Sequence, residues 1–252
     1  MAETIEGRNP VMEALKAGRP MRKILLERNI LKQGIIADLL QQAREQGIPV
    51  EFVDRQVIAR QSTTGKSQGV IGYSAAREYT SLDELMAIPP ARTAPPLFCV
   101  LDGIEDPHNL GAIIRTAEAT GVQGVIIRSR RAAGLTAAVA RASAGAIEYM
   151  PVARVVNIPR ALEEMKKQGI WVTGIDMDGT IPYHAVDFQP PSAIVIGSEG
   201  KGLSALVRKR CDYLAYIPMK GKITSLNASI AAGVVMYEVL RQRASALKVN
   251  AV

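Results

Sequence analysis

Polar side chains and glycines gather in three segments of the sequence, each of which follows an apolar run and leads into a helix-like stretch. The segments span residues 106–115, 196–203 and 217–227. Loops between strands and helices present backbone N–H groups and helix N-termini, which suit a nucleotide-type ligand. None of the three contains the fingerprint G-x-G-x-x-G, so an enzyme that binds a nucleotide in a conventional Rossmann pocket loses support.

The first segment places Asn109, Gly111 and Arg115 at the start of a predicted helix. Asn109 can cap the helix, Gly111 lets a ligand approach the backbone, and Arg115 follows about one and a half turns later, near the mouth of a site. An ordinary cap followed by a surface arginine explains this segment equally well.

The second segment encloses a carboxylate, Glu199, in a turn that contains Gly197, Gly200 and Gly202. Glycine-rich turns are common, but a carboxylate inside one is less so, which favours a functional role.

The third segment reaches an apolar helix, expected at residues 230–240, through Ser225, Leu226 and Asn227. Ser225 or Asn227 could simply cap that helix, and for this segment alone the cap is the better interpretation.

Short apolar runs after residue 97 must position the three loops. Helix-like segments separate these runs, as a mostly parallel sheet covered on both faces requires, so this part of the chain is predicted to be α/β. The ligand would then bind at the carboxyl ends of the strands. Strands are expected at residues 97–101, 125–127, 170–174, 193–196 and 214–217.

A smaller α/β module is predicted before this region. A proline-rich stretch with four prolines between residues 89 and 96 suits a linker. We therefore divide the chain into a domain at 1–75, a linker at 76–96 and a domain at 97–252. The elements expected in the first domain are strands at 24–26, 50–53 and 70–73 and a helix at 35–46.

Taken together and in this order, the three segments resemble the signature motifs of the SpoU (TrmH-like) family of RNA methyltransferases. Family members often carry valine where this chain has Ala228 and Ile230, which is a mild difference in packing. Residues 7–15 and 67–70 resemble the small substrate-binding module of the ribosomal-RNA branch, which is similar to ribosomal protein L30e. The motif residues that carry the resemblance are Asn109, Gly111, Arg115, Gly197, Glu199, Gly200, Gly202, Ile217, Pro218, Met219, Ser225, Leu226 and Asn227.

The resemblance implies a SPOUT fold, in which a parallel sheet ends in a C-terminal trefoil knot, preceded by an L30e-like domain. It implies a homodimer that uses S-adenosylmethionine, without a metal, to methylate a ribose 2′-hydroxyl, with a guanosine of 23S ribosomal RNA as the expected target. The implied catalytic residues are Arg115, Asn109, Glu199, Ser225 and Asn227. The implied cofactor contacts are Thr173, Gly174, Gly197, Gly202, Ile217, Met219, Ser225 and Leu226.

Several alternatives stay open at this point. In one alternative, Arg115 is the base that removes the 2′-hydroxyl proton. In the other, it remains a cation that clamps a neighbouring phosphate, and this role agrees with the fact that a guanidinium is hardly ever deprotonated. The substrate could be transfer RNA. A catalytically silent RNA-binding factor for ribosome assembly is a third reading, and the presence of Arg115, Glu199 and Asn227 counts against it.

The bulk composition fits an RNA partner. The net charge is +7, which favours an anionic ligand. The candidate phosphate contacts are Arg8, Arg22, Lys23, Arg128, Arg130 and Arg131, although any one of them is more often a solvated surface charge.

Neither the cysteines nor the histidines form a motif. Cys99 and Cys211 lack zinc-ligand or disulfide spacing, and His108 and His184 show no metal-ligand pairing. No run approaches the roughly 18 apolar residues that a membrane-spanning helix needs. We therefore expect a cytoplasmic protein without a metal or a membrane segment.

Overall fold

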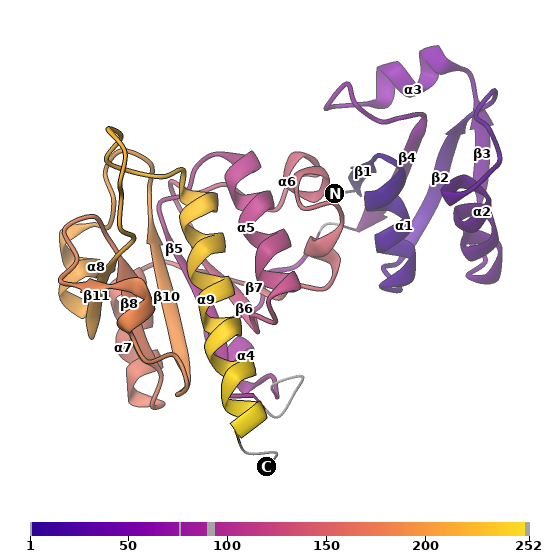
Figure 1. Cartoon of the computed structure of the whole chain (residues 1–252). Helices are drawn as coiled ribbons and strands as arrows, with labels where there is room; N and C mark the ends of the chain where they lie inside the picture. Colours follow the sequence, from indigo (N-terminus) through magenta and orange to yellow (C-terminus); the bar gives the residue numbers. More distant parts are fainter. Residues whose placement is uncertain (1, 76, 90–93, 250–252) are drawn as a thin grey trace. The chain divides into compact units, whose positions relative to one another are not determined.

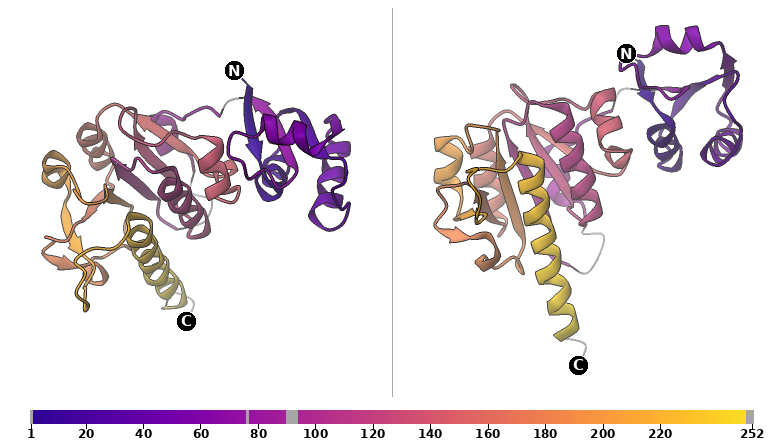
Figure 2. Two further views of the ribbon diagram at one scale, coloured as in Figure 1. Left: turned by 90° about the horizontal axis from the view of Figure 1, so that it is seen from above. Right: turned by 45° about the horizontal axis from the view of Figure 1, so that its top comes forward.

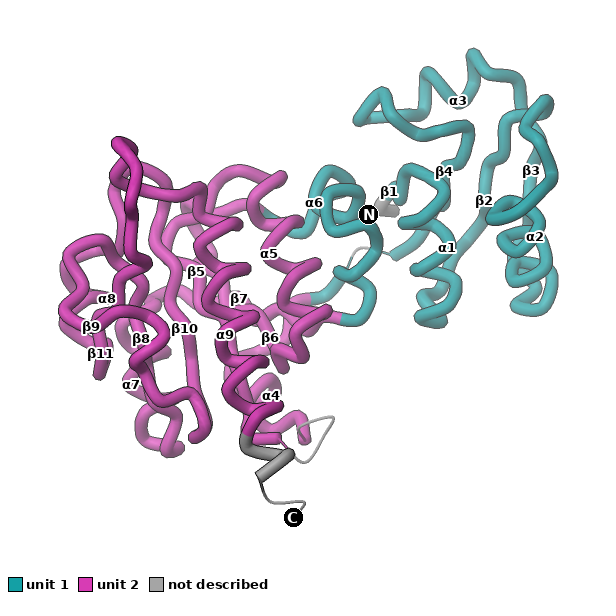
Figure 3. The backbone as a smooth tube through the Cα atoms, viewed as in Figure 1, with its two compact units in different colours: residues 1–78, 134–149 teal, residues 79–133, 150–252 magenta. Residues whose placement is uncertain are grey.

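The computed structural model of the chain describes residues 2–75, 77–89 and 94–249. They form two compact units, which are described separately. Unit 1 comprises residues 1–78 and 134–149, and unit 2 comprises residues 79–133 and 150–252 (Figure 3).

Unit 1 contains a four-stranded sheet in the order β1-β4-β2-β3. Strand β4 is antiparallel to β1 and β2, whereas β3 is parallel to β2. The apolar residues of helices α1 and α2 recur at helical spacing and pack with Ile5, Ile24 and Leu26 to form the core. The elements are β1 (Ala2–Glu6), α1 (Arg8–Lys16), β2 (Met21–Glu27), α2 (Ile35–Glu45), β3 (Val50–Val53), α3 (Arg55–Gln61) and β4 (Val70–Ala75), with α6 (Ala137–Ala142) and η1 (Ala146–Glu148) from the later segment.

The later segment is bound to the rest of unit 1 by specific contacts. The Glu148 carboxylate, which is almost fully buried, pairs with Arg19 at 3.0 Å and with Arg77 at 2.6 Å. The Tyr149 hydroxyl donates to the Glu13 carboxylate at 2.7 Å. Residues 134–149 thus form part of unit 1, whereas the division predicted from the sequence places them in the second domain. No local pattern marks such a segment, because its partners lie far away in the sequence.

Unit 2 is built on a seven-stranded sheet in which each pair of neighbouring strands is parallel. This confirms the predicted parallel α/β architecture. The strands, in sheet order, are β7 (Val152–Val155), β6 (Gly124–Arg128), β5 (Leu97–Asp102), β10 (Ser192–Gly197), β8 (Trp171–Ile175), β11 (Tyr213–Tyr216) and β9 (Ile181–Pro182).

Helices cover both faces of this sheet (Figures 1 and 2). Helices α4 (Leu82–Ala87), α7 (Ile158–Lys167) and α8 (Ala205–Arg210) bury apolar side chains against Phe98, Val100 and Val172. On the other face, α5 (Pro107–Ala119) and α9 (Ala228–Val249) lie side by side. A short helix η2 (Tyr183–Ala185) completes the unit. No helix among the described residues is long and apolar enough to cross a membrane.

The interval 76–96, expected to be a linker, contains helix α4. Ser81 and Glu84 form a capping box at its start, and Leu82 and Leu85 are buried in the core of unit 2. The prolines that suggested a linker lie after this helix, and residues 76 and 90–93 lie outside the described residues. The Ser-x-x-Glu spacing is the sequence signal that could have located α4.

Candidate active site

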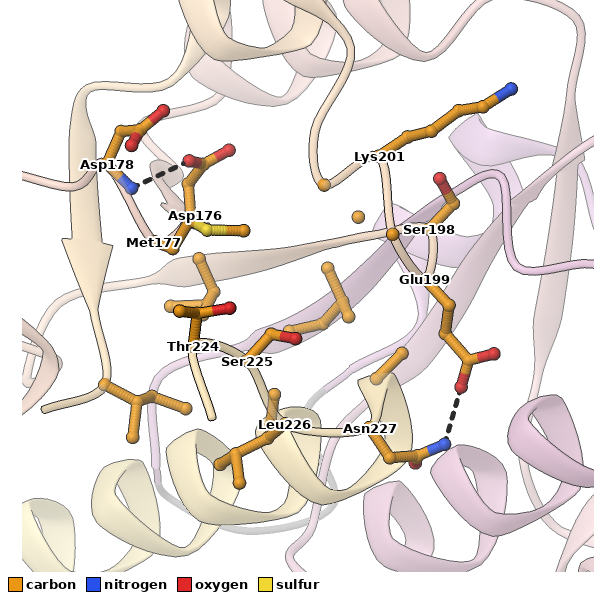
Figure 4. Close-up of a pocket in the computed structure, with 18 of the residues that line it drawn as sticks. Asp176, Met177, Asp178, Ser198, Glu199, Lys201, Thr224, Ser225, Leu226 and Asn227 are labelled. Carbon is orange, nitrogen blue, oxygen red and sulfur yellow. Dashed lines mark hydrogen bonds between the residues drawn. The ribbon is translucent and has the colours of Figure 1, made fainter. Parts of the chain in front are cut away.

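A cavity of about 430 Å³ lies in unit 2 at the carboxyl ends of the parallel strands (Figure 4). Because parallel strands end at the same edge, the loops after β8 and β10 meet there with the segment that connects β11 to α9. Its lining combines apolar residues such as Ile175, Ile217 and Leu226 with polar ones such as Asp176 and Ser225. The cavity therefore suits a ligand that has both a flat apolar part and hydroxyl or charged groups.

The loop after β10 closes tightly on itself. Ser198 and Gly202 exchange two backbone hydrogen bonds of 3.1 and 2.9 Å. Gly202 has a φ of +61°, and a Cβ atom on Gly197 would overlap the Gly202 backbone. Both positions therefore require glycine, and the closed loop carries Glu199 beside the cavity.

One hydrogen-bond network joins all three sequence motifs. The Asn109 side chain, buried at the start of α5, donates to the Glu199 carboxylate at 2.7 Å. The Asn227 side-chain amide donates to the same Glu199 oxygen at 2.6 Å (Figure 4) and to the Asn109 side-chain oxygen Oδ1 at 3.0 Å. The carboxylate thus fixes the two amides, and through them the starts of α5 and α9, relative to the glycine loop.

Asn227 also caps α9. Its side-chain oxygen accepts the Ser229 backbone N–H at 2.9 Å and the Ser229 hydroxyl at 2.6 Å. The cap that the sequence suggested is therefore present, and the opposite end of the same side chain belongs to the network.

Most of the predicted cofactor contacts line the cavity. They are Gly197, Gly202, Ile217, Met219, Ser225 and Leu226. Thr173 and Gly174 do not line it, because they lie within β8, paired with β10 and β11. A Cβ atom at Gly174 would meet Leu203 and Cys211 in the packed interior. The next residues of the chain, 175–178, line the cavity instead.

Arg115 is exposed on α5 and does not line the cavity. Within the described part of the chain, its guanidinium makes no hydrogen bond or ion pair. Of the five predicted catalytic residues, the structure brings Asn109, Glu199 and Asn227 into contact and places Ser225 in the cavity wall, whereas Arg115 stands apart from them.

Asp176 is a cavity residue that the sequence reasoning missed. It is only 8% exposed, and its side chain points into the cavity (Figure 4). One carboxylate oxygen lies 3.4 Å from the Arg208 guanidinium and accepts the Asp178 N–H at 3.1 Å. A carboxylate that directly follows an apolar strand is the signal that could have found it.

A second hollow of about 540 Å³ shares the loop 198–202 with the cavity. It is lined by Arg128 and Arg131, two of the candidate phosphate contacts, and Arg128 lies 3.6 Å from the buried Asp102 carboxylate. Among the other candidates, Lys23 pairs with Glu51. Arg22 and Arg130 are exposed, and Arg8 lines a hollow of unit 1.

Comparison with known proteins agrees with this geometry. The model of the SpoU rRNA methylase family matches residues 96–237, which is more than half of the chain and contains all three motifs. The chain belongs to the SpoU rRNA methylase family. A second model, for the substrate-binding domain of RNA 2′-O ribose methyltransferases, matches residues 4–80.

Individual SpoU relatives cover almost the whole chain. A putative TrmH family tRNA/rRNA methyltransferase, YacO of Bacillus subtilis, is 49% identical over 94% of this chain and 94% of its own length. The SpoU methyltransferase AviRb of Streptomyces viridochromogenes, solved with AdoMet, has a TM-score of 0.81 at 27% identity and covers 96% of this chain and 90% of that one. An AdoMet-bound rRNA methyltransferase from Sinorhizobium meliloti has a TM-score of 0.74 at 26% identity and covers 95% of this chain and 87% of that one.

Proposed function

We propose that this SpoU protein transfers a methyl group from S-adenosylmethionine to a ribose 2′-hydroxyl of RNA, with a guanosine of 23S ribosomal RNA as the expected target. The observation that carries the proposal is the Asn109–Glu199–Asn227 network, which ties the three motif loops together beside the cavity. The AdoMet-bound relatives of the same fold support the choice of cofactor.

The residues of the cavity fit this cofactor. Ile175, Ile217 and Leu226 offer apolar surface to the adenine ring of the cofactor. Asp176 and Ser225 offer hydrogen-bonding groups to the hydroxyl and amino groups of the cofactor. When bound, the cofactor supplies a methyl group that is already activated on a sulfonium. The protein must then mainly align the 2′-oxygen and manage its proton.

For Arg115 we favour the role of a phosphate clamp over that of a base. A cationic guanidinium can hold a substrate phosphate with two parallel hydrogen bonds and stabilise negative charge that develops on the 2′-oxygen. Its exposure on α5 and the absence of a partner in the described part of its own chain leave it available for RNA.

We further propose a homodimer in which Arg115 of one subunit completes the site of the other. The first support is that Arg115 does not line the cavity of its own chain. The second support comes from exposed apolar side chains along α9, of which Ile230 is 56% and Tyr237 is 55% exposed. These two residues are seven positions apart and therefore lie on one face of the helix, as a helix-to-helix interface requires.

Ribosomal RNA is the preferred substrate class because the S. meliloti rRNA methyltransferase matches both units of this chain. We assign selection of the RNA to unit 1, an L30e-like fold in this proposal, since a substrate-binding model matches it. A trefoil knot in unit 2 and a cytoplasmic location complete the proposal.

Calorimetry and methylation assays test the function. S-adenosylmethionine or its demethylated product should bind the purified protein. When 23S ribosomal RNA from cells that lack the protein is incubated with the purified protein and S-adenosylmethionine, it should gain one 2′-O-methyl group. If neither compound binds, with or without RNA, the methyltransferase proposal is wrong. Methylation of transfer RNA alone would overturn the choice of ribosomal RNA as the substrate. RNA binding without any cofactor binding or methylation would indicate an assembly factor.

A further inference from the structure

Unit 1 has a hollow of about 920 Å³ of its own. It lies at the sheet edge where β1, β2 and β3 end and β4 begins. The start of α1, the segment after β2, helix α3 and the loop 62–69 all contribute to its lining. This is the edge at which the loops of parallel strands commonly bind ligands, and we refer to the hollow as the unit 1 groove.

Positive charge dominates the polar groups of the groove. Arg8 and Arg55 line it with one carboxylate, that of Glu27. In the described part of the chain, Arg55 has no ion pair, and the Arg8 guanidinium makes only a 3.4 Å hydrogen bond to the Gln68 backbone oxygen. Both guanidinium groups are therefore available to a phosphate, for which their planar donors are suited.

The remaining side chains suit a nucleobase. The exposed Asn9 and Asn29 amides have no hydrogen-bond partner in the described part of the chain, and an amide offers both a donor and an acceptor to a base edge. Glu27 can accept a hydrogen bond from a ring or exocyclic N–H group. Leu31 is 76% exposed and can cover the face of a base. Base edges and faces are reachable in this way only where a nucleotide is unpaired.

The wall of the groove is fixed before any ligand arrives. Glu6, fully buried at the end of β1, accepts hydrogen bonds from the Ser62 hydroxyl at 2.6 Å, the Thr63 N–H at 2.7 Å and the Thr64 hydroxyl at 2.5 Å. These contacts hold the loop 62–69 against the sheet. A loop that is already ordered loses little conformational entropy on binding.

We propose that the unit 1 groove binds an unpaired nucleotide of the RNA substrate, with its phosphate on Arg8 and Arg55 and its base edge on Asn29 and Glu27. The proposal rests on the RNA methyltransferase function, and it names the feature of the RNA that unit 1 recognises. The groove is separate from the cofactor cavity, because all its lining residues belong to unit 1.

The test uses the full chain and a fluorescent, unstructured RNA of about ten alternating A and C nucleotides. Arg8→Ala and Arg55→Ala should each weaken binding about three- to ten-fold. Each should also make the slope of log affinity against log salt less negative by about 0.7, the value for one lost contact to a single-stranded phosphate. Asn29→Ala should weaken binding without changing that slope. The duplex formed with the complementary strand should bind more weakly than the single strand.

Arg44→Ala is the matched control, since Arg44 is an exposed arginine in the last turn of α2, nine residues beyond the groove residue Ile35. It should leave affinity and slope unchanged. If the Arg8 and Arg55 variants bind like Arg44→Ala, or if duplex and single strand bind equally, the groove proposal is wrong. Cofactor affinity, measured on the same variants, separates the two proposals, because it should stay at the wild-type value whether or not the groove binds RNA.

Discussion

Asn227 uses the two ends of its side chain for different tasks. The oxygen caps α9, and the nitrogen donates to Glu199 and Asn109. Alanine would remove both functions at once, so an alanine variant by itself could not show which one matters.

A serine substitution separates the two tasks. Asn227→Ser should keep the cap, since serine caps helices as well as asparagine, and should leave the unfolding free energy within about 0.5 kcal/mol of wild type. It should still reduce methylation at least about ten-fold, because the shorter side chain does not reach Glu199. Asn227→Ala should additionally lose about 1 kcal/mol of stability. Full activity in the serine variant, with the stability defect confined to alanine, would reduce Asn227 to a helix cap.

Asp176 supplies a buried charged acceptor to the cavity. Asp176→Asn keeps the size of the side chain but removes its charge, and hydrogen bonds to charged groups are worth more than those to neutral ones. We expect S-adenosylmethionine to bind at least about ten-fold more weakly by calorimetry. The control is Asp187→Asn, since Asp187 is an exposed aspartate of unit 2 that does not line the cavity. Equal affinities for the two variants would remove Asp176 from the cofactor site.

At the scale of elements, hydrophobic patterning predicted the central strands well. The expected runs 97–101, 125–127 and 193–196 lie within β5, β6 and β10. Patterning missed three edge strands, β1, β7 and β9, each of which has five residues or fewer. The pattern does mark Asp176 as a carboxylate that directly follows a strand, but its position beside the cavity depends on the pairing of β8 with β10 and β11.

Sequence patterns could not predict the contacts within the candidate site. The motif resemblance brought Asn109, Glu199 and Asn227 onto one list, but their hydrogen bonds depend on how three loops converge in space. Only the structure showed that Arg115, named with them, lies outside that network.

The loop that borders the unit 1 groove depends on an ionised carboxylate. Burial raises the pKa of Glu6, but hydrogen bonds from Ser62, Thr64 and Thr63 outweigh this effect, and the pKa is lowered overall. A carboxyl group whose pKa is lowered by folding stabilises the protein above its unfolded pKa and loses that contribution as the pH falls through the folded pKa.

Glu6→Gln should therefore destabilise the protein at pH 7 by about 1.5–3 kcal/mol, the range for hydrogen bonds to a charged group. The difference from wild type should shrink as the pH falls below about 4, the ordinary range of a glutamate, because the wild-type carboxylate becomes protonated as well. Urea unfolding of both proteins across this pH range measures the effect. A difference that does not change with pH would mean that the charge of Glu6 is not what stabilises the loop.

At the scale of the whole molecule, the proposed shared site predicts complementation between two inactive proteins. Arg115→Ala and Asn227→Ala should each be nearly inactive alone. In a mixed dimer, one of the two sites receives both wild-type residues. Random exchange makes half of the dimers mixed, so about a quarter of the wild-type activity should return.

The control is a mixture of Asn109→Ala and Asn227→Ala. These residues touch within one chain, so every site in their mixed dimer carries a lesion and no activity should return. If the Arg115 mixture is confirmed to contain mixed dimers and also stays inactive, Arg115 acts within its own subunit.

Because residues 134–149 belong to unit 1, they affect when this unit can fold during translation. Glu148, the buried partner of Arg19 and Arg77, leaves the ribosome only after β5, α5 and β6 have been synthesised. A nascent chain that stops near residue 133 would therefore hold a first unit without its ion-pair partner. N-terminal domains commonly fold first during translation. Here we expect unit 1 to gain full resistance to protease only when more than half of the polypeptide has emerged, after β5, α5 and β6 of unit 2 have been synthesised.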